Sequence, residues 1–435
     1  MSGSRIHNLK PCPIDIVVAG LALLLLLTGI IMVGSASTEV SNRIYGDPLY
    51  MFIKHSAYVV ISLGIAAIAL MMPIKSWQQI DWVLLLLSFA LLIAVLVPGV
   101  GHTVNGSTRW ISLGFFTVQG SEFVKLFAIV YISGYLVRRK EEIFDSLSGF
   151  IKPLALISLM VLLLLEQPDF GASVVIMASI LGVIFLAGVP FKHFVPIILS
   201  VGAAAFVIVQ WQPYRLKRFE AFTDPWAHQF DSGYQLTQAL IAFGRGEWFG
   251  LGLGNSIQKL FFLPEAHTDF LFSILAEELG VVGGVIVISA FTWLVIKAIL
   301  ISRRARNQGK EFHANLASGI ALLLGVQSAI NIGVNMGLLP TKGLTLPLVS
   351  YGGNSLIISC VLIAILLRIE FECREEAERP IRKSVQKKRS TAKPKSSEVK
   401  ASLQEKLSRG ATDKPKKVRA KASRSQPKAA GAKRI

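Results

Sequence analysis

The sequence predicts an all-α integral membrane protein with ten transmembrane helices. Hydrophobic residues make up 52% of its 435 residues and the mean hydropathy is +0.56, a balance that excludes an ordinary soluble domain. Apolar runs of the roughly 20 residues needed to cross a bilayer recur along the chain. The predicted spans are 14–34, 51–72, 80–97, 115–137, 151–166, 171–189, 193–211, 270–298, 314–337 and 346–369.

The orientation follows from the Lys and Arg residues between the spans. They gather in alternating connections, at 1–13, 138–142 and 297–310 and in the C-terminal tail. Because such residues favour the cytoplasmic side, we expect both termini in the cytoplasm. The largest loop on the opposite side is 212–269, between spans 7 and 8. The run at 14–34 is longer than the apolar core of a signal peptide, so we interpret it as a retained span.

The chain divides into a cytoplasmic N-terminus at 1–13, a membrane domain at 14–370 and a basic tail at 371–435. From Ile381 to Ile435 there are 19 Lys or Arg and 3 Asp or Glu, a balance of +16 within a total of +18. This Lys-, Ser- and Ala-rich tail is expected to be disordered. We interpret it as lying along anionic lipid or docking to a protein partner, and expect no nucleic acid.

The three cysteines, Cys12, Cys360 and Cys373, have no metal-binding or redox spacing. The chain contains no P-loop, no dinucleotide fingerprint and no zinc pattern. We therefore expect no nucleotide cofactor.

Charged residues inside the predicted spans call for an explanation, because a polar group in lipid is costly. Glu122 and Lys125 in "QGSEFVKL" are three residues apart, so they share a helix face and each offsets the burial cost of the other. They either form a structural ion pair or line a polar cavity. Glu277 and Glu278 are adjacent and point to different parts of a helix surface; packing is expected for at least one of them.

The segment 337–355, "GLLPTKGLTLPLVSYGGNS", interrupts an apolar pattern with two prolines and four glycines. Irregular backbone at membrane depth is tolerated where it is buried in protein or lines a water-filled cavity. Its free amides and Lys342 are suited to hold an anion such as phosphate, and Ser350 is a further candidate for binding substrate. In the loop 212–269, basic residues and aromatic rings suit a sugar–phosphate headgroup at the outer leaflet.

These segments together resemble the SEDS family (shape, elongation, division and sporulation proteins), over residues 14–370. Within the family, "GLGNSIQK" and "LPTKG" favour the division members over the elongation members. The sequence departs from the common pattern at Gly120, Thr345 and Asn354, none of which is a proposed chemical group. The matching segments are "GSTRWISLG" (106–114), "SEFVKL" (121–126), "QPDFGAS" (167–173), "FTDPW" (222–226), a long block from Gly233 to Gly280 and "GLLPTKGLTLPLVSYGGNSL" (337–356).

The resemblance implies a ten-span peptidoglycan glycosyltransferase of the bacterial cytoplasmic membrane at the division septum. Such enzymes polymerise lipid II, an undecaprenyl-pyrophosphate-linked disaccharide-pentapeptide, on the outer face of the membrane. They work with a class B penicillin-binding protein, which crosslinks the product, and with other membrane proteins of the divisome. The family's essential carboxylate corresponds to Asp269 of "LPEAHTDF", and its "SEFxKL" charges correspond to Glu122 and Lys125.

The expected chemistry is one displacement with inversion, in which a sugar hydroxyl attacks an anomeric carbon and pyrophosphate departs. Asp269 is the candidate general base, a role that contributes about 10²–10⁴-fold. His267 is a candidate to tune the base or touch substrate, and Glu265 is assigned to the loop. The leaving pyrophosphate needs positive charge. Candidates to supply it are Arg109, Arg215, Lys259, Lys342 and a divalent cation, Mg or Mn, whose protein ligands the sequence does not identify.

Two other functions suit a ten-span chain with buried charges. A lipid II flippase would concentrate polar residues near the membrane midplane, whereas here they are densest at the predicted outer edge. A non-catalytic scaffold that recruits the penicillin-binding protein would not depend on Asp269.

Overall fold

The computed structural model describes residues 14–104, 107–112, 114, 117–145, 147–190, 194–196, 199–200, 202–203, 222–340, 343–392 and 396–409. The chain separates into two units that meet between Glu375 and Glu376. The first unit holds the apolar helices and every described candidate site residue. In the second, the described residues form the end of one long helix and one separate helix.

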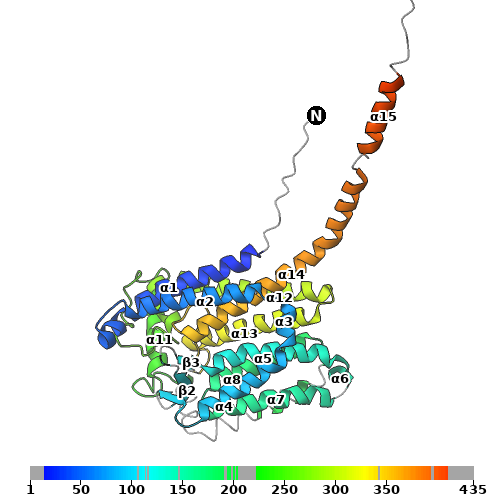
Figure 1. The fold of residues 1–435 in the computed structure, drawn as a ribbon. Helices are drawn as coiled ribbons and strands as arrows, with labels where there is room; N and C mark the ends of the chain where they lie inside the picture. Colours follow the sequence, from blue (N-terminus) through cyan, green and yellow to red (C-terminus); the bar gives the residue numbers. More distant parts are fainter. Residues whose placement is uncertain are drawn as a thin grey trace, which may run out of the picture. The chain divides into compact units, whose positions relative to one another are not determined.

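The first unit is a bundle of helices, shown in Figure 1. Its members are α1 (Ile16–Tyr45), α2 (Tyr50–Met71), α3 (Ile74–Gln79), α4 (Asp81–Leu96), α5 (Gly120–Arg138), α6 (Lys140–Asp145), α7 (Leu147–Glu166), α8 (Phe170–Leu186), α11 (Tyr234–Gly246), α12 (Leu271–Asn307), α13 (Glu311–Asn335) and the first part of α14 (Gly353–Ala392).

Six of the described helices, α1, α2, α5, α7, α12 and α13, are long and apolar enough to cross a membrane, and α4 and α8 are shorter apolar helices. All eight overlap predicted spans, and α14 begins within the tenth. Most of the seventh predicted span, 193–211, lies outside the described residues. The helical membrane class is therefore confirmed, whereas the count of ten spans stays a prediction.

A small antiparallel sheet departs from the all-α prediction. It consists of β1 (Gly101–Val104), β2 (Ser107–Ser112) and β3 (Thr117–Gln119), in the order β1-β2-β3. Its residues follow α4, and β3 lies within the first residues of the predicted span 115–137. The segment "STRWIS" in β2 is rich in β-branched and aromatic side chains, which favour strands. Figure 1 shows β2 and β3 near α11, at the end of the bundle opposite α6.

Helix α7 contains a proline yet stays continuous. Pro153 has no amide hydrogen, so the carbonyl of Gly149, four residues earlier, loses its helical donor. The hydroxyl of Tyr135 on α5 donates to that carbonyl at 3.2 Å. A neighbouring helix thus satisfies the acceptor that the proline frees.

The centre of the bundle is built by α5 and α13. The share of the apolar window that is buried is 83% for α5 and 72% for α13, compared with 39% or less for the other four long apolar helices. Helix α13 packs against α12, α8 and α5. Polar side chains on α5 and α13 therefore face protein neighbours and not lipid.

Helix α12 is broken at Gly280, which has φ 69° and ψ −169°. The break frees the amides of Val281 and Val282, which donate to carbonyls of residues 247–248 at 2.9 and 3.2 Å. On its other side, the carbonyls of 277–278 accept from the amides of 251–252, each at 3.0 Å. The "GLGLG" turn thus docks into the break, and the eighth predicted span, 270–298, is two helical pieces.

The end of the first unit is fixed by charged residues on α14. The Glu372 carboxylate accepts from Arg368 at 2.8 Å, from the backbone amide of Ile74 at 3.1 Å and interacts with His313 at 2.9 Å. Burial would raise the pKa of Glu372, but these hydrogen bonds outweigh it and lower the pKa to about 2. These contacts join α14 to α3 and α13.

The basic tail, which we expected to be disordered, is helical in part. Helix α14 continues past the predicted span end at 369 to Ala392, and α15 spans Ser396–Arg409. Within the first unit, ion pairs between residues four apart support this continuation, at 2.8 Å for Arg368–Glu372 and 2.5 Å for Arg374–Glu370. Residues 410–435 lie outside the described residues.

Candidate functional site

The segment 263–270, "LPEAHTDF", forms tight turns ahead of α12. Glu265 has a φ of 57°, and its carbonyl accepts from the amides of Thr268 and Phe270 at 3.1 and 3.3 Å. The Thr268 hydroxyl donates to the Glu265 carboxylate at 2.7 Å. Glu265 is therefore engaged within the turn, as its assignment to the loop predicted. The helix begins at Leu271, so Asp269 precedes it by two residues.

The carboxylate of Asp269 lies at the junction of two irregular segments. Its side chain is partly exposed. A Cβ placed on Gly343 would lie 3.0 Å from Oδ2 of Asp269. The structure thus brings the "HTDF" turn together with the "LPTKG" segment, 74 positions further along the chain, which is a proximity that sequence spacing does not reveal.

Two asparagines that our sequence analysis did not single out hold the backbone of this turn. Asn331 and Asn335 on α13 each donate from Nδ2 to the carbonyl of Asp269, both at 2.9 Å. Asn335 also accepts from the amide of Ser273 at 3.1 Å, and this N–H at the start of α12 donates in addition to the carbonyl of Phe270 at 3.0 Å. The spacing of these residues could have identified them from the sequence, because polar side chains recur every four positions, at 327, 331 and 335, in an otherwise apolar helix.

The predicted pair Glu122–Lys125 forms, with Nζ of Lys125 2.9 Å from the Glu122 carboxylate, and both side chains are buried. Lys125 also donates to the side-chain carbonyl of Gln327 on α13 at 2.7 Å. The amide of Gln327 in turn donates to the carbonyl of Thr345 at 3.0 Å. The ion pair is therefore connected to the segment that adjoins Asp269, and its direct contact with substrate stays a prediction.

Ser350 and His267 lie beside this segment. The buried hydroxyl of Ser350 accepts from the amide of Leu346 at 3.0 Å and closes a turn. The ring of His267 packs edge-on against Tyr351, with centroids 5.5 Å apart, and its carbonyl accepts from the Tyr351 amide at 3.0 Å. Burial lowers the pKa of His267, and the charge of Glu265 offsets part of that effect. The imidazole is therefore neutral at pH 7.

Lys259 forms a buried ion pair with Glu278. Its Nζ lies 2.9 Å from the carboxylate of Glu278 and 2.9 Å from the hydroxyl of Ser35 on α1. Adjacent Glu277 accepts from the amides of 257–258 at 3.2 and 3.3 Å. Both glutamates are fully buried and anchor the loop ahead of α12, so Lys259 holds this loop in the described arrangement.

The other predicted cations are placed less centrally or fall outside the described residues. Arg109 on β2 donates from Nε to the carbonyl of Gln167 at 3.2 Å and from Nη2 to that of Pro168, which ties the sheet to the turn between α7 and α8. Arg215 and Lys342 lie outside the described residues, although Gly343 directly follows Lys342.

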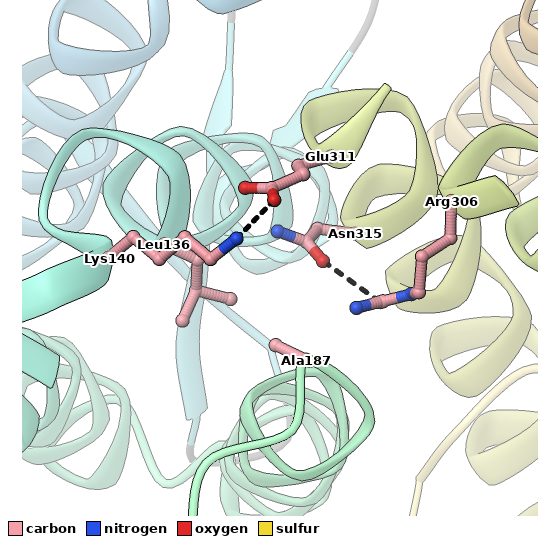
Figure 2. A pocket seen from close by; sticks show the side chains of 6 residues that line it. All are labelled: Leu136, Lys140, Ala187, Arg306, Glu311 and Asn315. Atoms are coloured by element: carbon pink, nitrogen blue, oxygen red, sulfur yellow. Dashed lines mark hydrogen bonds and ion pairs between the residues drawn. The ribbon is translucent and has the colours of Figure 1, made fainter. Parts of the chain in front are cut away.

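Within the described ranges, no three His, Cys, Asp or Glu side chains are grouped as a metal site would need. One small pocket of about 30 Å³ lies at the opposite predicted side of the membrane. Figure 2 shows Lys140 pointing to Glu311 and Arg306 pointing to Asn315 within it. Its volume suits about two water molecules and excludes a lipid-linked disaccharide.

A Gly343→Ala variant tests the close approach to Asp269. The added methyl would displace the carboxylate by a few tenths of an ångström, and we expect catalysis to fall by about 10-fold. Initial rates of the glycan polymerisation that the sequence resemblance implies, with purified protein, measure the effect. Gly244→Ala in α11 is the control, because its Cβ would meet no atom within 4 Å and its rate should be unchanged. Equal rates for Gly343→Ala and the wild type would contradict the prediction.

Comparisons with known proteins agree with this architecture. Residues 16–375 match the model of a family described as "Cell cycle protein", which groups FtsW, RodA and SpoVE. A relative from Hahella chejuensis, named "Probable peptidoglycan glycosyltransferase FtsW", is 52% identical over 366 residues, or 84% of this chain and 92% of the relative. One of the same name from Pseudomonas fluorescens is 52% identical over 352 residues, or 81% and 86%.

Solved structures show the same fold. A chain from a peptidoglycan synthase complex that coordinates polymerization and crosslinking is similar with a TM-score of 0.69 and 26% identity, covering 83% of this chain and 98% of that one. The rod shape determining protein RodA of Thermus thermophilus is similar with a TM-score of 0.60 and 26% identity, covering 82% and 96%.

Proposed function

Because this chain belongs to the family of cell cycle proteins that groups FtsW, RodA and SpoVE, we propose that it is the division-type member, a peptidoglycan glycosyltransferase that polymerises lipid II. Relatives about half identical to it over most of its length carry that activity in their names. The observation that carries the assignment to a site is the partly exposed Asp269 carboxylate at the junction of the "HTDF" and "LPTKG" segments.

In the proposed reaction, Asp269 accepts the proton of the 4-hydroxyl of the acceptor sugar. That oxygen attacks the anomeric carbon of the donor, the carbon–oxygen bond to pyrophosphate breaks, and undecaprenyl pyrophosphate leaves. The α linkage of the donor becomes a β linkage, so one inversion suffices and no covalent enzyme intermediate forms. Pyrophosphate departs unprotonated when its charge is stabilised, so a second carboxylic acid is not required.

The leaving pyrophosphate is the proposed binding site of a divalent cation. Magnesium is commonly held by one or two carboxylates together with substrate phosphates, and not by an all-protein cage. Lys342 and Arg215 are the proposed cationic side chains on this leaving group.

The proposed setting is the bacterial cytoplasmic membrane at the division septum, with both termini in the cytoplasm and the site at the outer face. The proposed crosslinking partner is a class B penicillin-binding protein. The similarity to a chain of a peptidoglycan synthase complex that coordinates polymerization and crosslinking supports this partner.

The test is polymerisation of labelled lipid II by the purified protein in the presence of the penicillin-binding protein, whose transpeptidase serine is blocked. Glycan chains that are resolved on a gel and cut by a muramidase are expected. The absence of chains with partner, metal and detergent all varied would refute the proposal. Movement of labelled lipid II between leaflets of a vesicle without chains would instead support the flippase.

Removal of divalent cations is expected to lower the initial rate by at least about 10-fold, because the charge on pyrophosphate is then less stabilised. The measurement is the polymerisation rate after treatment with EDTA, followed by addition of Mg or Mn. Addition of Ca alone compares a larger cation with less strict geometry. An unchanged rate in EDTA would remove the cation from the mechanism and leave the positive side chains as the stabilising groups.

A further inference from the structure

Three side-chain amides lie along one face of α13. Gln327, Asn331 and Asn335 are spaced four residues apart, which aligns them on the helix surface. Their exposed fractions are 3%, 2% and 0%. A buried amide is costly unless it is hydrogen-bonded, so the partners of these three residues, here called the amide stripe, show what this face of α13 holds.

Asn331 and Asn335 form hydrogen bonds with the backbone at the start of α12. Asn331 and Asn335 both donate to the carbonyl of Asp269, so this single acceptor carries two hydrogen bonds from one helix. Asn335 also accepts from the amide and the hydroxyl of Ser273, at 3.1 and 2.7 Å. The backbone is thereby held against α13 at two points, the carbonyl of Asp269 just before α12 and the amide of Ser273 in its first turn.

Gln327 and Asn331 form hydrogen bonds with the segment 343–345, which lies beside Asp269. Asn331 donates its second hydrogen to the carbonyl of Leu344, and Gln327 donates to the carbonyl of Thr345 at 3.0 Å. These carbonyls directly follow Gly343, beside which the Asp269 carboxylate lies. The two backbone segments beside the Asp269 carboxylate, residues 269–273 and 343–345, are here called the two walls of the site. Asn331 bridges them, because its side-chain amide donates to the backbone of each.

We infer that the amide stripe is a positioning element of the transferase, which sets the Asp269 carboxylate against the segment 343–345. The inference rests on the proposed role of Asp269 as the base. No member of the stripe needs to touch substrate. A helix that holds the backbone of both segments through hydrogen bonds of 2.9–3.0 Å limits their relative movement. A displacement of about 1 Å from productive geometry costs about 10²-fold in rate.

The decisive variant is Asn331→Leu, which keeps the shape of the side chain and removes both donated hydrogen bonds. We expect kcat for lipid II polymerisation to fall by about 10- to 100-fold while KM changes by less than about 2-fold. Asn331→Ser, which retains one donor and is less bulky, is expected to give an intermediate kcat. Rates are normalised to folded protein by size-exclusion chromatography and thermal unfolding.

The matched control is Asn315→Leu. Asn315 is on the same helix and 4% exposed, and it accepts from Arg306 at 3.2 Å in the pocket of Figure 2. It should lower the unfolding temperature without lowering kcat. Wild-type kcat in both Asn331 variants, or an equal loss of kcat in Asn315→Leu, would overturn the positioning role.

Asp269→Asn, measured in the same assay, separates the inference from the proposed function. An inactive Asp269→Asn together with a fully active Asn331→Leu overturns the positioning role alone. A fully active Asp269→Asn overturns the role of Asp269 and the positioning inference with it.

Discussion

Replacement of Asp269 by asparagine is expected to slow polymerisation of lipid II by about 10²–10⁴-fold, the contribution of a positioned general base. Asparagine has the size and shape of aspartate but does not accept a proton at neutral pH. The backbone carbonyl of residue 269, which receives hydrogen bonds from Asn331 and Asn335, is retained. The loss should therefore appear in kcat, with the thermal unfolding temperature close to that of the wild type.

The control for this variant is Glu265→Gln in the same turn. Glu265 is exposed, and its carboxylate is engaged with the hydroxyl of Thr268 at 2.7 Å. Its replacement is expected to leave the polymerisation rate within about 3-fold of the wild type, because a glutamine oxygen accepts the same hydrogen bond. An Asp269→Asn protein that polymerises at the wild-type rate would contradict the assignment of the base.

Gly280→Ala is expected to release the loop ahead of α12 and to lower both stability and activity. Gly280 has φ 69° and ψ −169°, a conformation essentially restricted to glycine, which costs a residue with a Cβ about 1–3 kcal/mol. The new Cβ would also lie 2.5 Å from the carbonyl carbon and oxygen of Trp248. Overpacking adds about 1–3 kcal/mol. The loop residues 247–252 must then leave the break, which exposes the amides of 281–282 and the carbonyls of 277–278 that they satisfied.

The measurements are thermal unfolding in lipid nanodiscs and limited proteolysis within 247–262. Gly254→Ala isolates the strain from the clash, because Gly254 has a φ of 83° but its Cβ would meet nothing within 4 Å. It should lose only the backbone contribution and resist proteolysis like the wild type. Equal behaviour of the two variants would show that the contact with Trp248 is unimportant.

Several features of the site followed from local sequence pattern. The spacing of Glu122 and Lys125 predicted one helix face, and the pair forms there. The loop 212–269 was predicted to end directly ahead of the span 270–298, and α12 begins at Leu271. Motifs of this kind are readable because they depend on residues within one turn of helix or one loop.

Other features depend on residues far apart in the chain. Lys259 looked like a free cation for pyrophosphate, but Glu278 and Ser35 bind it in the folded protein. The break at Gly280 was concealed in a continuous apolar run, because the groups that satisfy its backbone belong to the preceding loop. The sheet at 101–119 was missed because short strands carry little periodicity.

The sequence by itself determined a helical membrane chain of this family and pointed to Asp269, because apolar length and local motifs are properties of contiguous residues. Only the tertiary structure decided which groups meet Asp269. Asn331 and Asn335 are more than 60 positions away from it, and Gly343 is further still. Their proximity results from the packing of α13 against α12 and from the hydrogen bonds that buried amides must find.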